Sequence, residues 1–271
     1  MSQPPFFAPG IFQDQVALVT GGGSGIGLDA ARQMGQLGAK IAIVGRTPEK
    51  LEAGKASLEA DGIEVLTHPC DIRDAEAVGA MVDAVMSRFK RIDVLINNAG
   101  GQFPSPAEML SPRGWEAVIR NNLNGTFFVT SAVAQKAMIP AHRGRIVNVI
   151  ANVFRGFPGM AHTGAARAGV ENMTKSLAVE WARHGIGVNA VAPGTIRSSG
   201  TNQYGEELLE IARRATPMKR LGTPEETARV IVFLASHFNS YVTGSTYYID
   251  GGASLWGDIW QIEDAPAAGP S

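Results

Sequence analysis

The stretch Val16-Ala17-Leu18-Val19-Thr20-Gly21-Gly22-Gly23-Ser24-Gly25-Ile26-Gly27 decides the fold. Its first four residues form a short apolar run typical of a buried strand, and a glycine-rich loop follows without a break. The sequence after Gly27 can continue as a helix, so backbone N–H groups and the positive end of the helix dipole converge on the loop. We therefore expect a phosphate site here, the alternative being a flexible glycine loop without a ligand.

Three glycines of this loop have separate steric reasons to lack a side chain. A side chain at Gly21 would hinder the tight turn, and one at Gly25 would block the approach of a pyrophosphate. At Gly27 it would obstruct the packing of the helix on the strand. This division of roles is typical of turns that bind dinucleotides.

Bulk composition excludes several classes of function. A chain of 271 residues that is 45% hydrophobic can bury one large core. The formal net charge of −1 and the lack of a long basic run argue against nucleic acid or an anionic membrane as a partner. Cys70 is the only cysteine, which excludes an intrachain disulfide and predicts no metal cluster. With no signal peptide and no apolar run of membrane-spanning length, we expect a cytoplasmic protein.

Apolar runs typical of strands alternate with stretches of helical character along the chain. The runs lie at about 16–20, 40–45, 63–66 with 68–71, 92–97, 145–150, 187–192 and 246–250, and the helical stretches at 28–34, 48–60, 74–89, 111–139, 162–183 and 224–235. Helical crossovers of this size force a parallel sheet covered on both faces. The sequence thus predicts the α/β class, with a single doubly wound Rossmann-fold domain and a seven-stranded parallel sheet over 14–252, an N-terminal arm (1–13) and a C-terminal tail (253–271).

The residue after the second strand favours one dinucleotide over the other. In such folds this position faces the adenosine ribose, where an acid suits a free 2′-hydroxyl and a cation a 2′-phosphate. The strand ends in Gly45-Arg46, which predicts NADP(H) rather than NAD(H), unless Arg46 is a plain surface arginine. Asp71 is a candidate acceptor for the adenine amino group, with Ile72 beside the ring, or alternatively a cap for the helix that begins near Asp74.

The ordered set of motifs resembles the classical short-chain dehydrogenase/reductases over residues 14–252. The motifs are Thr20-Gly21-xxx-Gly25-x-Gly27, Asp71, Asn97-Asn98-Ala99-Gly100, Asn122-Leu123-Asn124-Gly125 and Pro193-Gly194-Thr195-Ile196. The resemblance implies that Asn122 is the active-site asparagine that holds a proton-relay water, a kink-stabilising helix residue being the alternative. The expected cofactor site comprises Thr20, Gly21, Ser24, Gly25, Ile26, Gly27, Arg46, Asp71, Ile72, Asn98, Ala99, Gly100, Arg167, Pro193, Gly194, Ile196 and Ser198.

The chain departs from the family at its usual catalytic residues. The tyrosine and the lysine four residues later fall on Thr163 and Arg167, and the usual serine falls on Ile150. A phenol made acidic by a neighbouring lysine is the family's proton carrier, so ordinary ketone reduction is not expected. Arg167 still offers charge and hydrogen bonds to the cofactor ribose.

Three segments resemble the peroxisomal trans-2-enoyl-CoA reductases and, more distantly, the 2,4-dienoyl-CoA reductases. They are Gly100 to Glu108, His162 to Val170 and Asn202 to Gly205. The resemblance implies reduction of the carbon–carbon double bond of an acyl thioester: hydride adds to the β-carbon, negative charge spreads onto the thioester oxygen, and a donor protonates the α-carbon. This chemistry needs oxyanion stabilisation more than a phenol.

The sequence leaves several residues as candidates for the proton donor. The subgroup's candidate tyrosine falls on Glu171, for which we favour a helical salt bridge with Lys175. Thr163 is a candidate donor to the thioester oxygen or a helix cap, and His162 a proton source or a structural histidine. Tyr204 lies in the variable segment between Pro193 and Pro217 that closes over substrate in this family, or else simply packs there. The catalytic candidates are Asn122, Thr163, Arg167 and Tyr204.

Two other functions stay open from the sequence. One is a dehydrogenase of an alcohol or 3-hydroxyacyl thioester with a substitute base, and the other is a non-catalytic NADP(H)-binding sensor or assembly protein. By resemblance, the last strand at 246–250 predicts a homotetramer. Trp256 and Trp260 are large apolar groups that a solvated tail does not need, and they are candidates to cover a neighbour's substrate opening.

Overall fold

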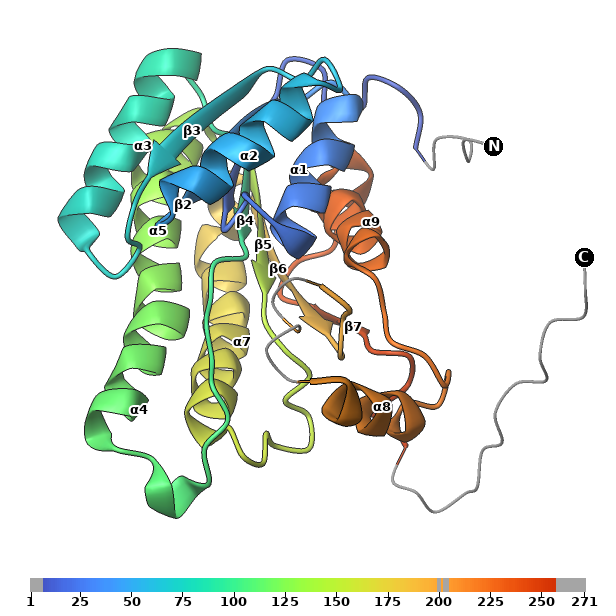
Figure 1. Cartoon of the computed structure of the whole chain (residues 1–271). Helices are drawn as coiled ribbons and strands as arrows, with labels where there is room; N and C mark the ends of the chain where they lie inside the picture. Colours follow the sequence, from blue (N-terminus) through green and yellow to red (C-terminus); the bar gives the residue numbers. More distant parts are fainter. Residues whose placement is uncertain (1–6, 199–200, 202–204, 257–271) are drawn as a thin grey trace, which may run out of the picture.

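The computed structural model of the protein describes residues 7–198, 201 and 205–256. Seven strands form one parallel sheet in the order β3-β2-β1-β4-β5-β6-β7 (Figure 1). The strands are β1 (Val16–Thr20), β2 (Lys40–Gly45), β3 (Val65–Pro69), β4 (Val94–Asn97), β5 (Gly144–Val149), β6 (Ile186–Pro193) and β7 (Thr246–Ile249). The doubly wound parallel sheet predicted from the sequence is confirmed.

Helices cover both faces of this sheet (Figure 1). Apolar side chains of α1 (Gly25–Gln36), α2 (Pro48–Glu59) and α9 (Pro224–Ala235) form one core. Those of α3 (Ala75–Phe89), α5 (Gly125–Val133) and α7 (Ala161–Trp181) form the other. The remaining helical segments are η1 (Ala107–Met109), α4 (Pro112–Ile119), η2 (Arg120–Asn124), η3 (Ala134–Met138), α6 (Ile139–Ala141), η4 (Ala182–His184), α8 (Gly205–Ala215) and η6 (His237–Asn239). In the described ranges, no helix has both the length and the apolar character that crossing a membrane requires.

The strand order places the site. β1 is buried along its whole length and pairs with β2 on one side and β4 on the other, so the chain winds outward in opposite directions from this point. Ligands of open α/β sheets bind at the carboxyl ends of the strands where the order reverses. The glycine-rich loop leaves β1 at that edge.

Two helical regions differ from the sequence prediction. The single helix expected within 111–139 runs from Pro112 to Ala141 and contains two π-helical turns, η2 and η3. Such turns insert an extra residue into a helix and often mark functional sites. α8 occupies part of the segment between Pro193 and Pro217, for which no helix was predicted.

A buried polar network lies beneath the carboxyl end of the sheet. Asn97 Nδ2 donates to Thr130 Oγ1 at 2.7 Å and to Asn148 Oδ1 at 2.8 Å. Asn148 Nδ2 in turn donates to Thr174 Oγ1 at 2.9 Å. All four residues are buried, so the network joins β4, β5, α5 and α7 in a low-dielectric interior, where the loss of a hydrogen-bond partner is costly.

We expect Asn148→Ala to lower the free energy of unfolding by roughly 2–3 kcal/mol, because in the core Asn97 Nδ2 loses one of its two acceptors and Thr174 Oγ1 loses its donor. Urea unfolding followed by circular dichroism measures this loss. Asn172→Ala, on the exposed side of α7, is the matched control and should stay within about 0.5 kcal/mol of the wild type. Equal unfolding free energies for the two variants would contradict the role of the network.

Candidate active site

The start of α1 is open to a ligand. Ser24 is the N-cap residue but its side chain makes no cap hydrogen bond, and the first turn holds no acidic residue. Gly25 has φ +54°, and a Cβ atom built on it meets only Ser198 Cβ, at 3.8 Å. The first N–H groups of the helix therefore face open space, as an anion site requires.

Gly21 and Gly27 are required by close packing between two loops. A Cβ atom on Gly27 would lie 2.5 Å from Asn98 Nδ2 and 2.6 Å from the Gly21 carbonyl oxygen. The close approach at Gly27 is thus to the glycine loop and Asn98, whereas the sequence suggested packing of the helix on the strand. Asn98 Nδ2 donates to the carbonyl oxygens of Thr20 and Gly21, at 3.1 and 3.2 Å. The Thr20 hydroxyl accepts from the N–H groups of Asn98 and Ala99, both at 3.0 Å, so Thr20 holds the loops together from behind.

A pocket of about 330 Å³ runs from the glycine loop to the ends of β2 and β3. Arg46, which the sequence assigns to the cofactor site, lines this pocket, and so does Lys50, in the first turn of α2, which the sequence reasoning missed. The sequence signal for Lys50 was Pro48: a helix that begins at this proline has Lys50 in its first turn, close to Arg46 in the chain. No carboxylate is among its described lining residues, which are Gly21, Gly23, Ser24, Gly25, Ile26, Gly45, Arg46, Thr47, Lys50, Leu51, Cys70, Ile72, Asn98, Ala99, Gly100, Asn121 and Ser198.

Asp71 lines an adjoining hollow instead of this pocket. Its carboxylate accepts from Arg73, with Nε at 2.9 Å from Oδ1 and Nη2 at 2.5 Å from Oδ2. These hydrogen bonds lower the pKa of Asp71 to about 2. The cap of α3 is Asp74, which accepts from the N–H groups of Glu76 and Ala77. Asp71 therefore does not cap the helix, and binding of an adenine amino group by Asp71 has to compete with Arg73.

A second cavity, of about 600 Å³, adjoins the first pocket and shares Ile26, Asn98, Gly100 and Ser198 with it. One end of this cavity contains backbone and polar groups from the carboxyl ends of the strands. The rest of the lining is Gly101, Gln102, Val149, Ile150, Ala151, Asn152, Phe157, Met160, Arg167, Pro193, Gly194, Thr195, Ile196, Thr201, Leu208, Leu209, Ala212, Ala215, Thr216 and Ala253. We define this as the substrate cavity.

Arg167 is a buried cation in the wall of the substrate cavity. Its side chain lies beside Gly100, where a Cβ atom would overlap the guanidinium, and the residue is only 8% exposed. Nη1 donates to the Val149 carbonyl oxygen at 2.9 Å, while Nε is buried without a partner. Burial lowers the pKa of Arg167 to about 10, so the group stays charged at neutral pH. Within the described ranges it makes no ion pair, which leaves a costly unpaired charge facing the cavity.

Thr163 and His162 do not line the substrate cavity. Both are fully buried, and the Thr163 hydroxyl lies 3.4 Å from His162 Nδ1. The Thr163 N–H donates to the same nitrogen at 2.8 Å, and Nε2 is buried with no partner within the described part of the chain. Thr163 lies inside α7, whose N-cap is Met160, so it does not cap the helix. Tyr204 lies outside the described residues.

Asn122 supports the wall of the site from the π-helical turn η2. It is fully buried, accepts from the Gly101 N–H and donates to the Gly101 carbonyl oxygen, each at 2.9 Å.

The expected ion pair between Glu171 and Lys175 is confirmed at 3.2 Å. Across the part of the chain that the structure describes, no three His, Cys, Asp or Glu side chains gather as metal ligands do.

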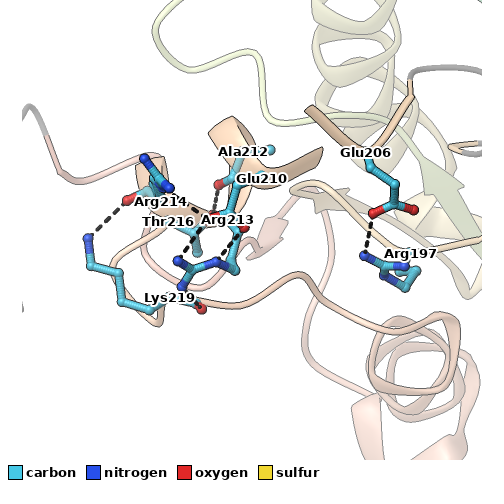
Figure 2. A network of polar contacts seen from close by, with 8 residues as sticks. All are labelled: Arg197, Glu206, Glu210, Ala212, Arg213, Arg214, Thr216 and Lys219. Carbon is cyan, nitrogen blue, oxygen red and sulfur yellow. Dashed lines mark hydrogen bonds and ion pairs between the residues drawn. The ribbon is translucent and has the colours of Figure 1, made fainter. Parts of the chain in front are cut away.

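The far wall of the substrate cavity is an amphipathic helix. Leu208, Leu209, Ala212 and Ala215 follow the helical spacing i, i+1, i+4, i+7 and face the cavity from α8. Figure 2 shows charged residues of this helix in ion pairs, Glu206 with Arg197 and Glu210 with Arg213 and Arg214. The apolar spacing was the signal by which the sequence could have revealed this wall.

The chain is similar to oxidoreductases whose names give different substrates. Residues 21–254 match a family model described as enoyl-(acyl carrier protein) reductase. A probable 2,4-dienoyl-CoA reductase of Bacillus subtilis (strain 168) is 40% identical over 248 residues, covering 90% of this chain and 98% of the relative. Gluconate 5-dehydrogenase of Gluconobacter oxydans (strain 621H) is 37% identical over 260 residues, covering 94% and 99%. The solved structure of a citronellol catabolism dehydrogenase (AtuB) of Pseudomonas aeruginosa PAO1 is 44% identical, with a TM-score of 0.84 and coverage of 92% and 99%.

Cys70, the only cysteine of the chain, gives a direct probe of the first pocket. Burial, together with the charges of Asp71 and Asp74, raises the pKa of its thiol to about 11. The thiolate is the reactive form, and at pH 8 only about a thousandth of Cys70 is in this form. Alkylation by iodoacetamide should therefore accelerate about tenfold per pH unit up to pH 11. Mass spectrometry of the intact protein measures the rate. The control is the chain unfolded in guanidinium, which should react fast at pH 8; equal rates for the folded protein would contradict the shift.

Proposed function

The chain belongs to the short-chain dehydrogenase/reductase family, and from this premise we propose that it reduces the carbon–carbon double bond of a trans-2-enoyl thioester with NADPH. Arg167 carries the proposal. It stands where the family's usual lysine stands, with Thr163 in place of the tyrosine, and its charge is buried and unpaired in the wall of the substrate cavity. Such a group suits an oxyanion better than a proton relay.

The first pocket supports NADP(H) as the nicotinamide cofactor. The uncapped start of α1 offers N–H groups for the pyrophosphate, and the open face of Gly25 leaves room for it. Arg46 and Lys50 line the other end, where a 2′-phosphate needs cations. A carboxylate for a free 2′-hydroxyl is lacking among the described lining residues.

The residues of the substrate cavity favour alkene reduction over oxidation of an alcohol. NADPH, when bound, supplies the hydride that adds to the β-carbon. Arg167, held by the Val149 carbonyl, stabilises the negative charge that develops on the thioester oxygen. The α-carbon then takes up a proton from solvent water, so the substrate gains one hydride and one proton in all. Among its described lining residues are no tyrosine, histidine, lysine or carboxylate, the side chains that serve as a general base for an alcohol.

The apolar wall of the substrate cavity supports a substrate with an aliphatic acyl chain attached to the thioester. Leu208 is 47% exposed although it faces the cavity, and Phe157 and Met160 also line it. Apolar surface in a concave site gains free energy when an apolar ligand covers it. A polyhydroxylated substrate such as a sugar acid would instead leave hydroxyl groups without partners along this wall.

Purified protein should oxidise NADPH when crotonyl-CoA or a longer trans-2-enoyl-CoA is added, as measured by absorbance of the reduced nicotinamide. We expect Arg167→Met to lower kcat by about 100-fold or more, because one preorganised cation leaves the oxyanion site. Arg183→Met, in η4 and outside the cavity, is the control and should not change kcat.

Two outcomes would contradict the proposal. Tight NADPH binding with no oxidation across several chain lengths would favour the non-catalytic sensor. Reduction of NADP⁺ by an alcohol or a 3-hydroxyacyl thioester, without enoyl reduction, would favour the dehydrogenase.

Arg46→Ser and Lys50→Ala should each weaken NADPH binding by roughly tenfold and leave NADH binding nearly unchanged, because each removes a charged hydrogen bond to the 2′-phosphate. Isothermal titration calorimetry with both dinucleotides measures the change. Lys55→Ala, on the same helix but outside the pocket, is the matched control. An equal loss of affinity for NADH would contradict the assignment of these residues to the 2′-phosphate.

A further inference from the structure

A second hollow of about 620 Å³ lies directly behind the substrate cavity. Thr195 and Thr216 line both spaces, so the two share a rim. The other residues around this distal hollow are Met218, Arg220, Gly222, Glu226, Tyr248, Ile249, Asp250, Gly251, Gly252, Ser254 and Leu255.

Thr216 is held in the rim by contacts with α8 and with Gly251. The Thr216 hydroxyl donates to the Ala212 carbonyl oxygen at 2.8 Å, as Figure 2 shows. A Cβ atom on Gly251 would lie 2.7 Å from Thr216 Cγ2, so the Thr216 methyl group fills the place of a side chain there. Lys219 Nζ donates to the Arg214 carbonyl oxygen at 2.9 Å, which fixes the turn after α8 and with it the position of Thr216.

The surface of the distal hollow is mostly apolar. Met218 and Leu255 are 65% and 82% exposed, and both line the hollow together with Ile249. Arg220 donates to both oxygens of Glu226, at 2.9 and 2.6 Å. The third charged residue, Asp250, accepts from Asn152 Nδ2 and from the N–H groups of Gly252 and Ser254. Large apolar side chains that line a concave surface mark a site for an apolar ligand.

We propose that the distal hollow binds the far end of the acyl chain of a long-chain thioester, with Thr195 and Thr216 as the rim that the chain crosses. This rests on the proposed function, in which Arg167, in the wall of the substrate cavity, holds the thioester. The α8 stripe of Leu208, Leu209, Ala212 and Ala215 lines the substrate cavity on the segment that leads to Thr216. Its two leucines come first and its two alanines lie nearer to Thr216 in the chain, so the side chains of the stripe become smaller toward the rim.

Met218→Trp tests the proposal, because it fills the distal hollow and leaves the lining of the substrate cavity unchanged. We expect kcat/KM for trans-2-dodecenoyl-CoA to fall at least tenfold relative to that for crotonyl-CoA, since each methylene that loses its site weakens binding by about fourfold. Ile211→Trp adds the same bulk to α8 at a residue that lines neither space, and it should leave the ratio as in the wild type. Binding of saturated acyl-CoA esters of the same two lengths, measured by calorimetry, gives a second readout without turnover.

Each result separates this proposal from the proposed function. Turnover of both esters with an unchanged ratio in Met218→Trp would overturn the distal hollow and leave the enoyl reductase in place. Binding of acyl-CoA esters without turnover would refute the reductase, and the hollow is then judged from the binding ratio alone. A wild-type protein that neither binds nor reduces any of these esters would overturn both.

Discussion

The site depends on the contact between the two loops that leave β1 and β4. Asn98 donates to the carbonyl oxygens of Thr20 and Gly21, and the Thr20 hydroxyl accepts two N–H groups in return. Gly21 and Gly27 have no room for a side chain within this contact. Because the loops are fixed to each other, the start of α1 faces a pocket of fixed shape. The arrangement holds the space for a dinucleotide before any ligand is present.

In this chain Arg167 stands at the position of the family's lysine, and its buried charge has no ion-pair partner among the described residues. An unpaired charge in a protein interior costs free energy, which a ligand of opposite charge recovers on binding. Arg167 has that unpaired charge next to Gly100, and Asn122 holds the neighbouring Gly101 in place. The proposed reductase uses this charge for a negatively charged thioester oxygen. The same reasoning explains why a tyrosine is not required.

The walls of the substrate cavity have opposite chemical character. The strand ends and Arg167 present backbone groups and charge, whereas α8 presents a stripe of leucine and alanine. Ion pairs on α8 hold its charged residues at the surface (Figure 2). A thioester with a polar head and an apolar chain matches both walls. In our proposal, the distal hollow continues the apolar wall beyond Thr216 and selects substrates by chain length.

The sequence by itself determined the parallel sheet, the glycine loop and the position of Arg46. These features follow from the alternation of apolar runs and helical stretches and from residues adjacent in the chain. Tertiary structure alone decided that Lys50 joins Arg46, that Asn122 holds Gly101, and that Thr163 lies away from the substrate cavity. It also turned the α8 stripe toward a cavity and not a core. These outcomes depend on which side chains from distant segments meet, and a periodic pattern specifies which face of an element is buried without specifying what lies against it.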